Sequence, residues 1–255
     1  SLTATGVHVA YTCCHRSYSS AALRRRLPRG PILLSGGGNL GDLYMNEENL
    51  RRAVLQDFPS RRIVQLPQTV YFQSMDEARR IAPLYTGHRD LHVMVRDHES
   101  RKWLDRHWSL PSCLAPDPAL GHKGIISHRS PDIDILCLLR NDAESRSELR
   151  KDAKSAGFVT EDWIKYAAGD QSSDNKASRL ELRYNRLIER LNYNGYRRNF
   201  ALSRSSSLRR RLAQQRENRG VRILCRARIV ITDRLHGHIL SLKAGIPSIL
   251  LDNTY

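Results

Sequence analysis

The sequence predicts an α/β protein built on parallel sheets. Short apolar segments near residues 8, 32, 63 and 93 alternate with stretches of helical periodicity. The same alternation restarts at residues 133–139 and returns in the strand, turn and helix of residues 228–240. Because strands that alternate with helices form parallel sheets covered by those helices, we expect two doubly wound, Rossmann-like domains.

The first predicted domain covers residues 1–124. The helix expected over residues 46–58 is typical of its elements, since its apolar residues recur on one face. A glycine-rich loop is expected at residues 35–42, between a buried strand and that helix. The other elements expected here are strands at residues 7–11, 32–34, 62–66 and 91–95 and helices at 19–27, 75–83 and 98–107.

The second predicted domain covers residues 125–255 and follows a connection rich in proline, glycine and histidine at residues 111–131. Its expected strands are residues 133–139, 228–232 and 248–251, and its expected helices include 143–154, 179–191 and 208–225. A doubly wound domain normally continues beyond such a last strand. We therefore expect that this second domain is incomplete.

Positive charge dominates the composition, with a formal net charge of +16 over 255 residues. Such a charge favours an anionic partner, which includes a phosphorylated metabolite, an acidic glycan, an anionic membrane surface or a nucleic acid. The alternative is that most of the charge is merely solvated, as in many arginine-rich chains.

Cysteine and histidine spacing argues against structural metal or disulfide chemistry. The five cysteines include no Cys-x-x-Cys pair, and the ten histidines form no His-Glu-x-x-His motif. No segment reaches the length of a membrane span. We expect a soluble, cytoplasmic protein without a bound metal, held on a membrane surface at most by its charge.

The turn at residues 233–236 is the strongest candidate site. It places Arg234 and His236 where a strand ends and a helix begins, the position at which α/β sheets bind ligands and helix N–H groups attract anions. The alternative is an ordinary turn in which Asp233 only caps the helix. An arginine and a histidine at this point predict an acidic ligand.

The glycine-rich segment matches Gly-x-Gly-x-x-Gly, but the rest of a dinucleotide site is missing. That site requires an acidic residue at the end of the second strand, where this chain has Gln65 and Gln68. We therefore interpret the glycines as allowing the backbone to approach a ligand or a facing domain, with Asn39 and Asp42 as polar contacts. A tight turn alone is the competing interpretation.

Taken together, four ordered motifs resemble the polysaccharide pyruvyl transferase family. They are Gly-Gly-Gly-Asn-Leu-Gly-Asp-Leu-Tyr at residues 36–44, Ile-Val-Gln-Leu-Pro-Gln-Thr at 63–69, Ile-Thr-Asp-Arg-Leu-His-Gly-His at 231–238 and Leu-Asp-Asn-Thr-Tyr at 251–255. The resemblance implies two domains similar to GT-B glycosyltransferases, no cofactor, and transfer of pyruvate from phosphoenolpyruvate onto two sugar hydroxyls as a ketal.

The resemblance also assigns roles to residues. It places Arg234, Leu235 and His236 in the phosphoenolpyruvate site, with Arg140 as a second arginine. Arginine suits the carboxylate and the phosphate because its planar fork binds in a bidentate manner, and a histidine can act as the general acid. We expect the first domain to bind the sugar or glycan, free or lipid-linked, through the residues Gly37, Gly38, Asn39, Gln65 and Gln68.

The general base for the sugar hydroxyl has two candidates, Asp42 and Asp117, and each is equally open to a role as a loop cap. Three other functions remain as alternatives: a GT-B-like glycosyltransferase that uses a nucleotide sugar, a basic nucleic-acid-binding protein, and an inactive member of the family. The basic stretch at residues 204–228 contains no aromatic residue for base stacking, which argues against specific nucleic-acid binding.

Overall fold

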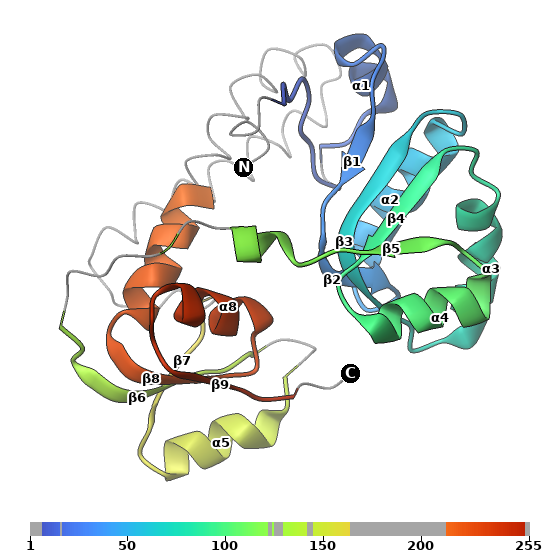
Figure 1. Ribbon diagram of the computed structural model, residues 1–255. Helices are drawn as coiled ribbons and strands as arrows, with labels where there is room; N and C mark the ends of the chain where they lie inside the picture. The colour runs from blue at the N-terminus through green and yellow to red at the C-terminus, as the bar shows by residue number, and fades with distance from the viewer. Residues whose placement is uncertain are drawn as a thin grey trace. The chain divides into compact units, whose positions relative to one another are not determined.

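The computed structural model describes residues 7–15, 17–121, 124, 130–141, 145–163 and 213–252. Contacts between these residues divide the chain after Pro118 into two compact units, and each has its own parallel sheet (Figure 1). The predicted α/β class with parallel sheets is confirmed. The arrangement as two GT-B-like domains and the boundary after residue 124 stay predictions.

The first unit has the strand order β1-β3-β4-β5, and β2 pairs with β3 beyond the end of β1. Every pair in this sheet is parallel, so the carboxyl ends of its strands share one edge. The strands are β1 (Ile32–Leu34), β2 (Gly37–Gly41), β3 (Ile63–Tyr71), β4 (Leu91–Val95) and β5 (Ser112–Leu114), and the helices are α1 (Ser20–Arg26), α2 (Met45–Asp57), α3 (Met75–Thr86) and α4 (His98–Trp108).

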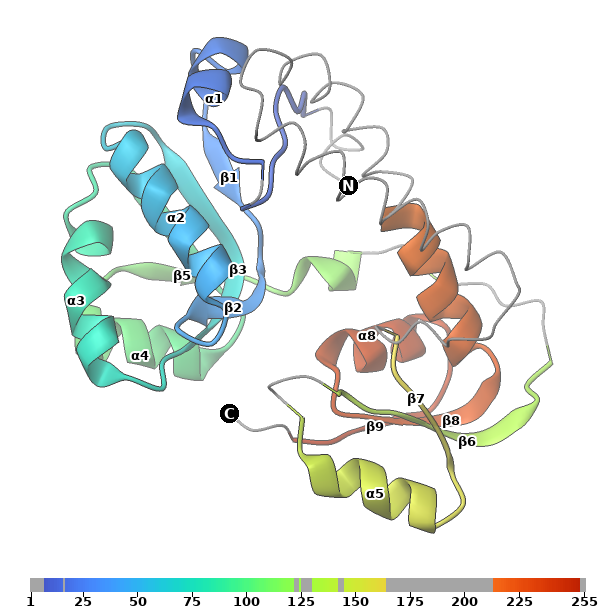
Figure 2. The same ribbon diagram turned by 180° about the vertical axis from the view of Figure 1, so that it is seen from behind.

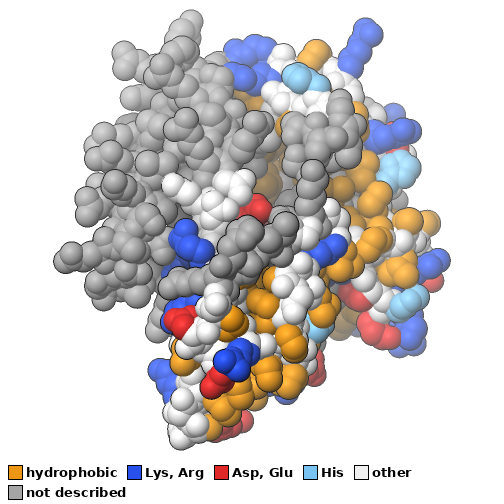
Figure 3. Space-filling view, turned by 60° about the vertical axis from the view of Figure 1, so that its left-hand side comes forward, with side chains coloured by type: hydrophobic (Ala, Val, Ile, Leu, Met, Phe, Trp, Pro, Cys, Tyr) orange, Lys and Arg blue, Asp and Glu red, His pale blue; other side chains and the backbone are white. Residues whose placement is uncertain are grey.

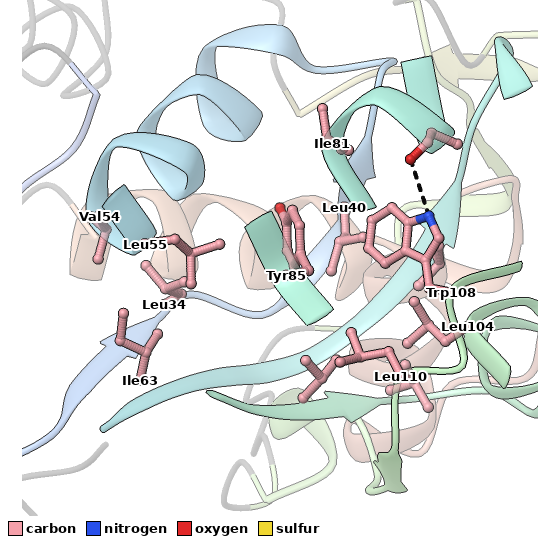
Figure 4. Close-up of a cluster of buried hydrophobic side chains, with 14 of the residues drawn as sticks. Leu34, Leu40, Val54, Leu55, Ile63, Ile81, Tyr85, Leu104, Trp108 and Leu110 are labelled. Carbon is pink, nitrogen blue, oxygen red and sulfur yellow. Dashed lines mark hydrogen bonds between the residues drawn. The ribbon is translucent and has the colours of Figure 1, made fainter. Parts of the chain in front are cut away.

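One hydrophobic cluster forms the core of the first unit. Apolar side chains from α2, α3 and α4 meet those of β1, β2, β3 and β4, and the fully buried Tyr85 and Leu40 lie among them (Figure 4). Trp108 donates its indole N–H to the Ala78 carbonyl at 3.1 Å, so this buried polar group is satisfied. Because the three helices bury their apolar faces together, this unit presents its strand ends on a rigid support.

The second unit has the strand order β7-β6-β8-β9, again with parallel pairs only. A 3-10 helix, η2 (Pro118–Gly121), lies where the two units meet in the sequence. The elements are β6 (Ile133–Leu138), α5 (Ser147–Ser155), β7 (Val159–Glu161), a helix over residues 213–224, β8 (Ala227–Thr232), α8 (Leu235–Lys243) and β9 (Ser248–Leu250).

Strand β6 is buried on both faces. Leu136 and Leu138 belong to a cluster with the helix over residues 213–224 and with α8, whereas Cys137 and Leu139 pack against α5. Helices α5 and α8 accordingly lie on opposite faces of the sheet (Figures 1 and 2). The continuous apolar run at residues 133–139 is the sequence signature of such a strand.

Several elements differ from the sequence prediction. The predicted strand at residues 7–11 does not form, the glycine-rich loop is strand β2, and β3 runs through Pro67 to Tyr71 instead of ending at residue 66. The register between β3 and β4 shifts between Gln65 and Gln68, which accommodates a proline that has no N–H to donate. Strand β7, which is three residues long, was not predicted.

We predict that Gly41→Ala lowers the free energy of unfolding by about 1–3 kcal/mol. A Cβ at Gly41 would lie 1.7 Å from the Tyr71 carbonyl oxygen, and its φ of +141° disfavours any other residue. Urea unfolding measures the change. Gly121→Ala is the matched control because a Cβ there meets nothing within 4 Å. An equal loss of unfolding free energy in both variants would show that the clash with Tyr71 is not the cause.

Candidate functional site

Charged residues follow three adjacent strands of the second unit. Arg140 comes two residues after β6, Asp162 directly after β7, and Asp233 and Arg234 directly after β8. From β6 the chain passes to β7 on one side and later returns to β8 on the other. The ends of β6 and β8 therefore form a topological switch point, where open α/β sheets bind their ligands.

Two side chains tie the ends of β6 and β8 together. Thr232 Oγ1 donates to the Leu138 carbonyl at 2.7 Å and accepts the Arg234 N–H at 3.0 Å. Asp233 Oδ1 accepts the Arg140 N–H at 2.9 Å. The N-cap residue of α8 is Arg234, so the alternative in which Asp233 only caps this helix is wrong. Asp233 instead connects two strand ends.

Arg234 forms a buried ion pair that the sequence did not predict. Its guanidinium Nη2 lies 2.8 Å from Asp162 Oδ1, and the two side chains are only 9% and 3% exposed. Asp162 escaped notice because β7 is too short to show a periodic pattern. Its only signal in the sequence is that two acidic residues, Glu161 and Asp162, follow a β-branched pair, and this signal is common.

The first turn of α8 lies against the same strand ends. Gly237 allows this close packing, because a Cβ there would lie 2.9 Å from Thr232 Oγ1. His236 is exposed in this turn, whereas His238 is half-buried and its Nδ1 lies 3.0 Å from Ser248 Oγ. The sequence-predicted residues Arg140, Arg234, Leu235 and His236 thus come together at one edge of the second sheet.

The glycines of the first unit bring two strands together. A Cβ at Gly36 would lie 2.6 Å from the Pro67 carbonyl oxygen, and one at Gly41 would clash with Tyr71. The close approach that these glycines permit is therefore to the backbone of β3, within the same sheet. This contact differs from the ligand or the facing domain that the sequence suggested.

Both predicted glutamines are buried beneath the glycine segment. Gln65 and Gln68 each donate from Nε2 to the Ser35 carbonyl at 2.8 Å. Gln68 also donates to Asn39 Oδ1 at 2.9 Å and accepts the Asn39 N–H at 3.0 Å. These contacts fix Asn39 at the carboxyl edge of the sheet, and a direct contact of either glutamine with a sugar stays a prediction.

Arg51 holds Asn39 from the other side. Its Nη2 donates to the Asn39 carbonyl at 2.9 Å and to Asn39 Oδ1 at 2.6 Å, while its Nη1 pairs with the fully buried Glu48. Glu48 Oε1 also accepts the Tyr85 hydroxyl at 2.8 Å and Arg52 Nε at 3.2 Å. Burial raises the pKa of Tyr85, so its hydroxyl remains a donor.

The network continues to the surface through Arg52, which pairs with Glu77. Hydrogen bonds from Arg80 and Arg52 lower the pKa of Glu77 to about 2. The buried carboxylate of the network is that of Glu48, and its three donors, Arg51, Arg52 and Tyr85, compensate the cost of burying its charge. Asn39 is therefore supported by charged residues that reach from the strand edge across α2 to α3.

The two candidate bases have different surroundings. Asp42 accepts the Gln73 N–H at 2.7 Å on Oδ1 and the Ser74 N–H at 2.8 Å on Oδ2, just before α3. Asp117 is 6% exposed, and its Oδ2 lies 2.8 Å from Arg96 Nη1. Asp42 thus makes the loop-capping contacts that were the alternative to catalysis, and the base role of either residue stays a prediction.

Arg96 connects Asp117 to two further strand ends. Its Nε donates to Thr69 Oγ1 at 2.8 Å, and Thr69 in turn donates to Asp97 Oδ2 at 2.8 Å. Asp97 caps α4 by accepting the Ser100 N–H at 2.7 Å. The chain of contacts therefore spans the carboxyl ends of β3, β4 and β5, and sequence reasoning missed Arg96 within it.

Charge is dispersed on the one face of the protein that Figure 3 shows. On the face shown in Figure 3, Lys and Arg side chains are scattered among uncharged ones and do not form one continuous patch. Residues 204–212 of the basic stretch at residues 204–228, and the helix predicted at residues 179–191, lie outside the described residues. Within the part of the chain that the structure describes, no cluster of His, Cys, Asp and Glu has the geometry of a metal site, and no helix is long and apolar enough to cross a membrane.

These two units define an α/β protein whose charged and polar candidate residues gather at the carboxyl edges of parallel sheets. Residues 5–255 match the sequence pattern of polysaccharide pyruvyl transferases. The chain belongs to this family, which is a family of transferases.

Individual relatives agree with the family. The chain is 28% identical to pyruvyl transferase 1 of Schizosaccharomyces pombe over 99% of its length, which covers 60% of that protein. It is also 28% identical, over 91% of its length and 68% of the relative, to EpsO of Bacillus subtilis, whose name marks it as a candidate pyruvyl transferase. The chain thus spans about three fifths to two thirds of these relatives.

We predict that Asp233 makes stability depend on pH. Burial raises the pKa of its carboxyl, although the hydrogen bond from the Arg140 N–H opposes this effect. The folded state then holds the proton more tightly than the unfolded state. The stabilisation that the protonated Asp233 carboxyl contributes is fully present below the ordinary aspartate pKa and is lost as the pH rises through the folded-state pKa. Over this range the free energy of unfolding falls by at most about 1.4 kcal/mol per pH unit.

Asp233→Asn removes this titration and keeps an oxygen for Arg140. The difference in unfolding free energy between wild type and variant should therefore fall as the pH rises from about 4 to 7. Urea unfolding across this range measures the difference. Asp252→Asn, at a carboxylate whose side chain is 81% exposed, is the charge-matched control, and a pH-independent difference for Asp233→Asn would refute the prediction.

Proposed function

We propose that this protein transfers pyruvate from phosphoenolpyruvate to two hydroxyls of a sugar, forming a ketal. The observation that carries the proposal is the meeting of Arg234, the first turn of α8 and the exposed His236 at the switch point of the second sheet. Family membership supports it, since polysaccharide pyruvyl transferases are transferases by name.

The reaction requires two bond-forming steps. One sugar hydroxyl oxygen attacks C2 of phosphoenolpyruvate while C3 gains a proton and becomes a methyl group. A second hydroxyl then attacks C2, and the C2–O bond to phosphate breaks, so inorganic phosphate leaves. The site must therefore bind two anionic groups, deliver a proton to carbon, and accept the protons of two hydroxyls.

In the proposed donor site, Arg234 and Arg140 bind the carboxylate and phosphate of phosphoenolpyruvate. Arginine provides several N–H donors in a fixed plane, and the amino end of α8 adds backbone N–H groups and the positive end of its dipole. His236 is the general acid, because imidazole exchanges protons near neutral pH and its side chain is exposed in the same turn. Leu235 forms the start of the helix.

In the proposed acceptor site, Asn39 faces the sugar at the edge of the first sheet, with Gly37 and Gly38 beside it. Gln65 and Gln68 support this segment through Ser35. The base is either Asp42 or Asp117, and comparison of Asp42→Asn with Asp117→Asn tests which one: only loss of the base should lower kcat with folding preserved. No cofactor or metal is required.

The acceptor belongs to exopolysaccharide or cell-surface glycan biosynthesis and is either lipid-linked or part of a glycan. The net charge of +16 supports an acidic acceptor or contact with an anionic membrane from the cytoplasmic side. Binding of this charge to nucleic acid would be unspecific.

Incubation with phosphoenolpyruvate and a panel of sugars tests the function. We expect release of phosphate together with a mass gain on the sugar that corresponds to the pyruvate ketal. A second incubation supplies nucleotide sugars in place of phosphoenolpyruvate, and transfer of their sugar to an acceptor would instead identify a glycosyltransferase. Absence of either product with every acceptor would refute both activities for this chain.

We predict that His236→Gln lowers kcat by about 10²- to 10⁴-fold. The substitution removes the proton donor but, at an exposed side chain, leaves the fold intact, which circular dichroism verifies. His238→Gln is the matched control, because this ring lies two residues away and contacts Ser248. Unchanged turnover in His236→Gln would exclude the assigned acid.

We predict that Arg51→Lys lowers kcat/KM for the sugar by about tenfold while the KM for phosphoenolpyruvate stays unchanged. A lysine retains the charge opposite Glu48 but lacks the planar fork that reaches both oxygens of Asn39. Arg52→Lys is the control because Arg52 bonds the same Glu48 without contacting Asn39. Steady-state kinetics with each substrate varied in turn measures both constants. A change confined to the KM for phosphoenolpyruvate would reverse the assignment of the donor and acceptor sites.

A further inference from the structure

Asp162 lies at the proposed donor site without having been assigned a role. It follows β7 directly, and its carboxylate is buried against Arg234 with 2.8 Å between Asp162 Oδ1 and Arg234 Nη2. Neither the motifs of the sequence nor the chemistry of pyruvyl transfer requires an acid at this position. An acid beside an anion-binding arginine also lowers the local positive potential, so its presence calls for a physical reason.

The backbone around Asp162 is fixed on both sides. Before it, Glu161 pairs with Leu138 of β6, and the Glu161 carbonyl accepts the Leu139 N–H at 3.0 Å. After it, Trp163 packs against the core cluster that contains Leu138. Gly220 makes room for this indole, since a Cβ there would lie 2.9 Å from two of its ring atoms. Asp162 therefore projects from a rigid part of the second unit.

An arginine side chain has many rotamers, and ordering it during ligand binding costs affinity. The guanidinium group has five N–H donors around one plane, so one edge can contact a carboxylate while another contacts an anion. A buried ion pair formed during folding orders the side chain before the ligand arrives.

We propose that Asp162 is a positioning residue that holds the Arg234 guanidinium in its anion-binding orientation. The inference rests on the proposed function for the identity of the anion, phosphoenolpyruvate, but not for the orientation itself. Asp162 touches Arg234 and acts on the ligand only through it.

The first test uses the ligand-free wild-type protein labelled with ¹⁵N-arginine. The Nε–Hε resonance of Arg234, assigned by its absence in Arg234→Lys, should show a rigid side chain and slow exchange with water before any ligand is added. A mobile Arg234 in the ligand-free protein would overturn the proposal, whatever the protein binds.

The second test compares phosphoenolpyruvate affinity by calorimetry in Asp162→Ala and Asp162→Asn. Asparagine keeps an oxygen that accepts from Arg234, so its dissociation constant should stay within about threefold of wild type, whereas alanine should raise it about tenfold or more. An equal loss of affinity in the two variants would mean that Asp162 acts through its charge alone, and unchanged affinity in Asp162→Ala would mean that Asp162 does not orient Arg234; either result would refute positioning. Glu161→Ala is the matched control, because its side chain pairs with Arg226 and not with Arg234.

The two tests separate this inference from the proposed function. A rigid Arg234 in a protein that does not bind phosphoenolpyruvate would refute the donor and leave the positioning role in place. Loss of one partner of a buried ion pair is destabilising. If Asp162→Ala does not fold, the resonance of Arg234 in the wild type and in Asp162→Asn decides the question: it should remain rigid in both.

Discussion

The arrangement of the second unit depends on the hydrogen bonds that join the ends of β6 and β8. Strands that neighbour each other in a sheet but lie far apart in sequence need such links to keep their ends level, and the residues that these bonds join are 93 and 94 positions apart. Thr232 and Asp233 each supply one link, and both side chains are almost fully buried. The same dipeptide that aligns the strands therefore also sets the starting point of α8, and with it the positions of Arg234 and His236.

The first unit solves the corresponding problem with amide groups and glycines. Glycine lets β2 lie close to β3, and the buried amides of Gln65 and Gln68 then satisfy the Ser35 carbonyl between β1 and β2. On α2, Arg51 bonds Asn39 of β2 and pairs with Glu48, which completes the support of this segment. Both units thus place their candidate residues on strand ends that buried polar contacts hold in place, which is how preorganised sites limit the cost of ordering side chains.

Sequence patterns revealed the parts of this structure that have a period or a motif. The alternation of apolar strands and amphipathic helices gave the α/β class, and the turn at residues 233–236 was found because an arginine and a histidine follow a strand. Asp162 and Arg96 were missed, since each follows a short or ordinary strand and gains its partner only through folding. Likewise, residues 37–41 form a strand and β3 continues to residue 71 because these two segments pair with each other. No local sequence pattern contains this contact.

The packing of Trp163 against Gly220 also gives the second unit an optical signal of its own. The chain has three tryptophans, and the other two, Trp103 and Trp108, lie in the aromatic cluster of the first unit with Phe72. With those two replaced by phenylalanine, the remaining indole emission would come from a single residue adjacent to Asp162. The fluorescence of this chain can therefore follow the melting of one unit separately from the other.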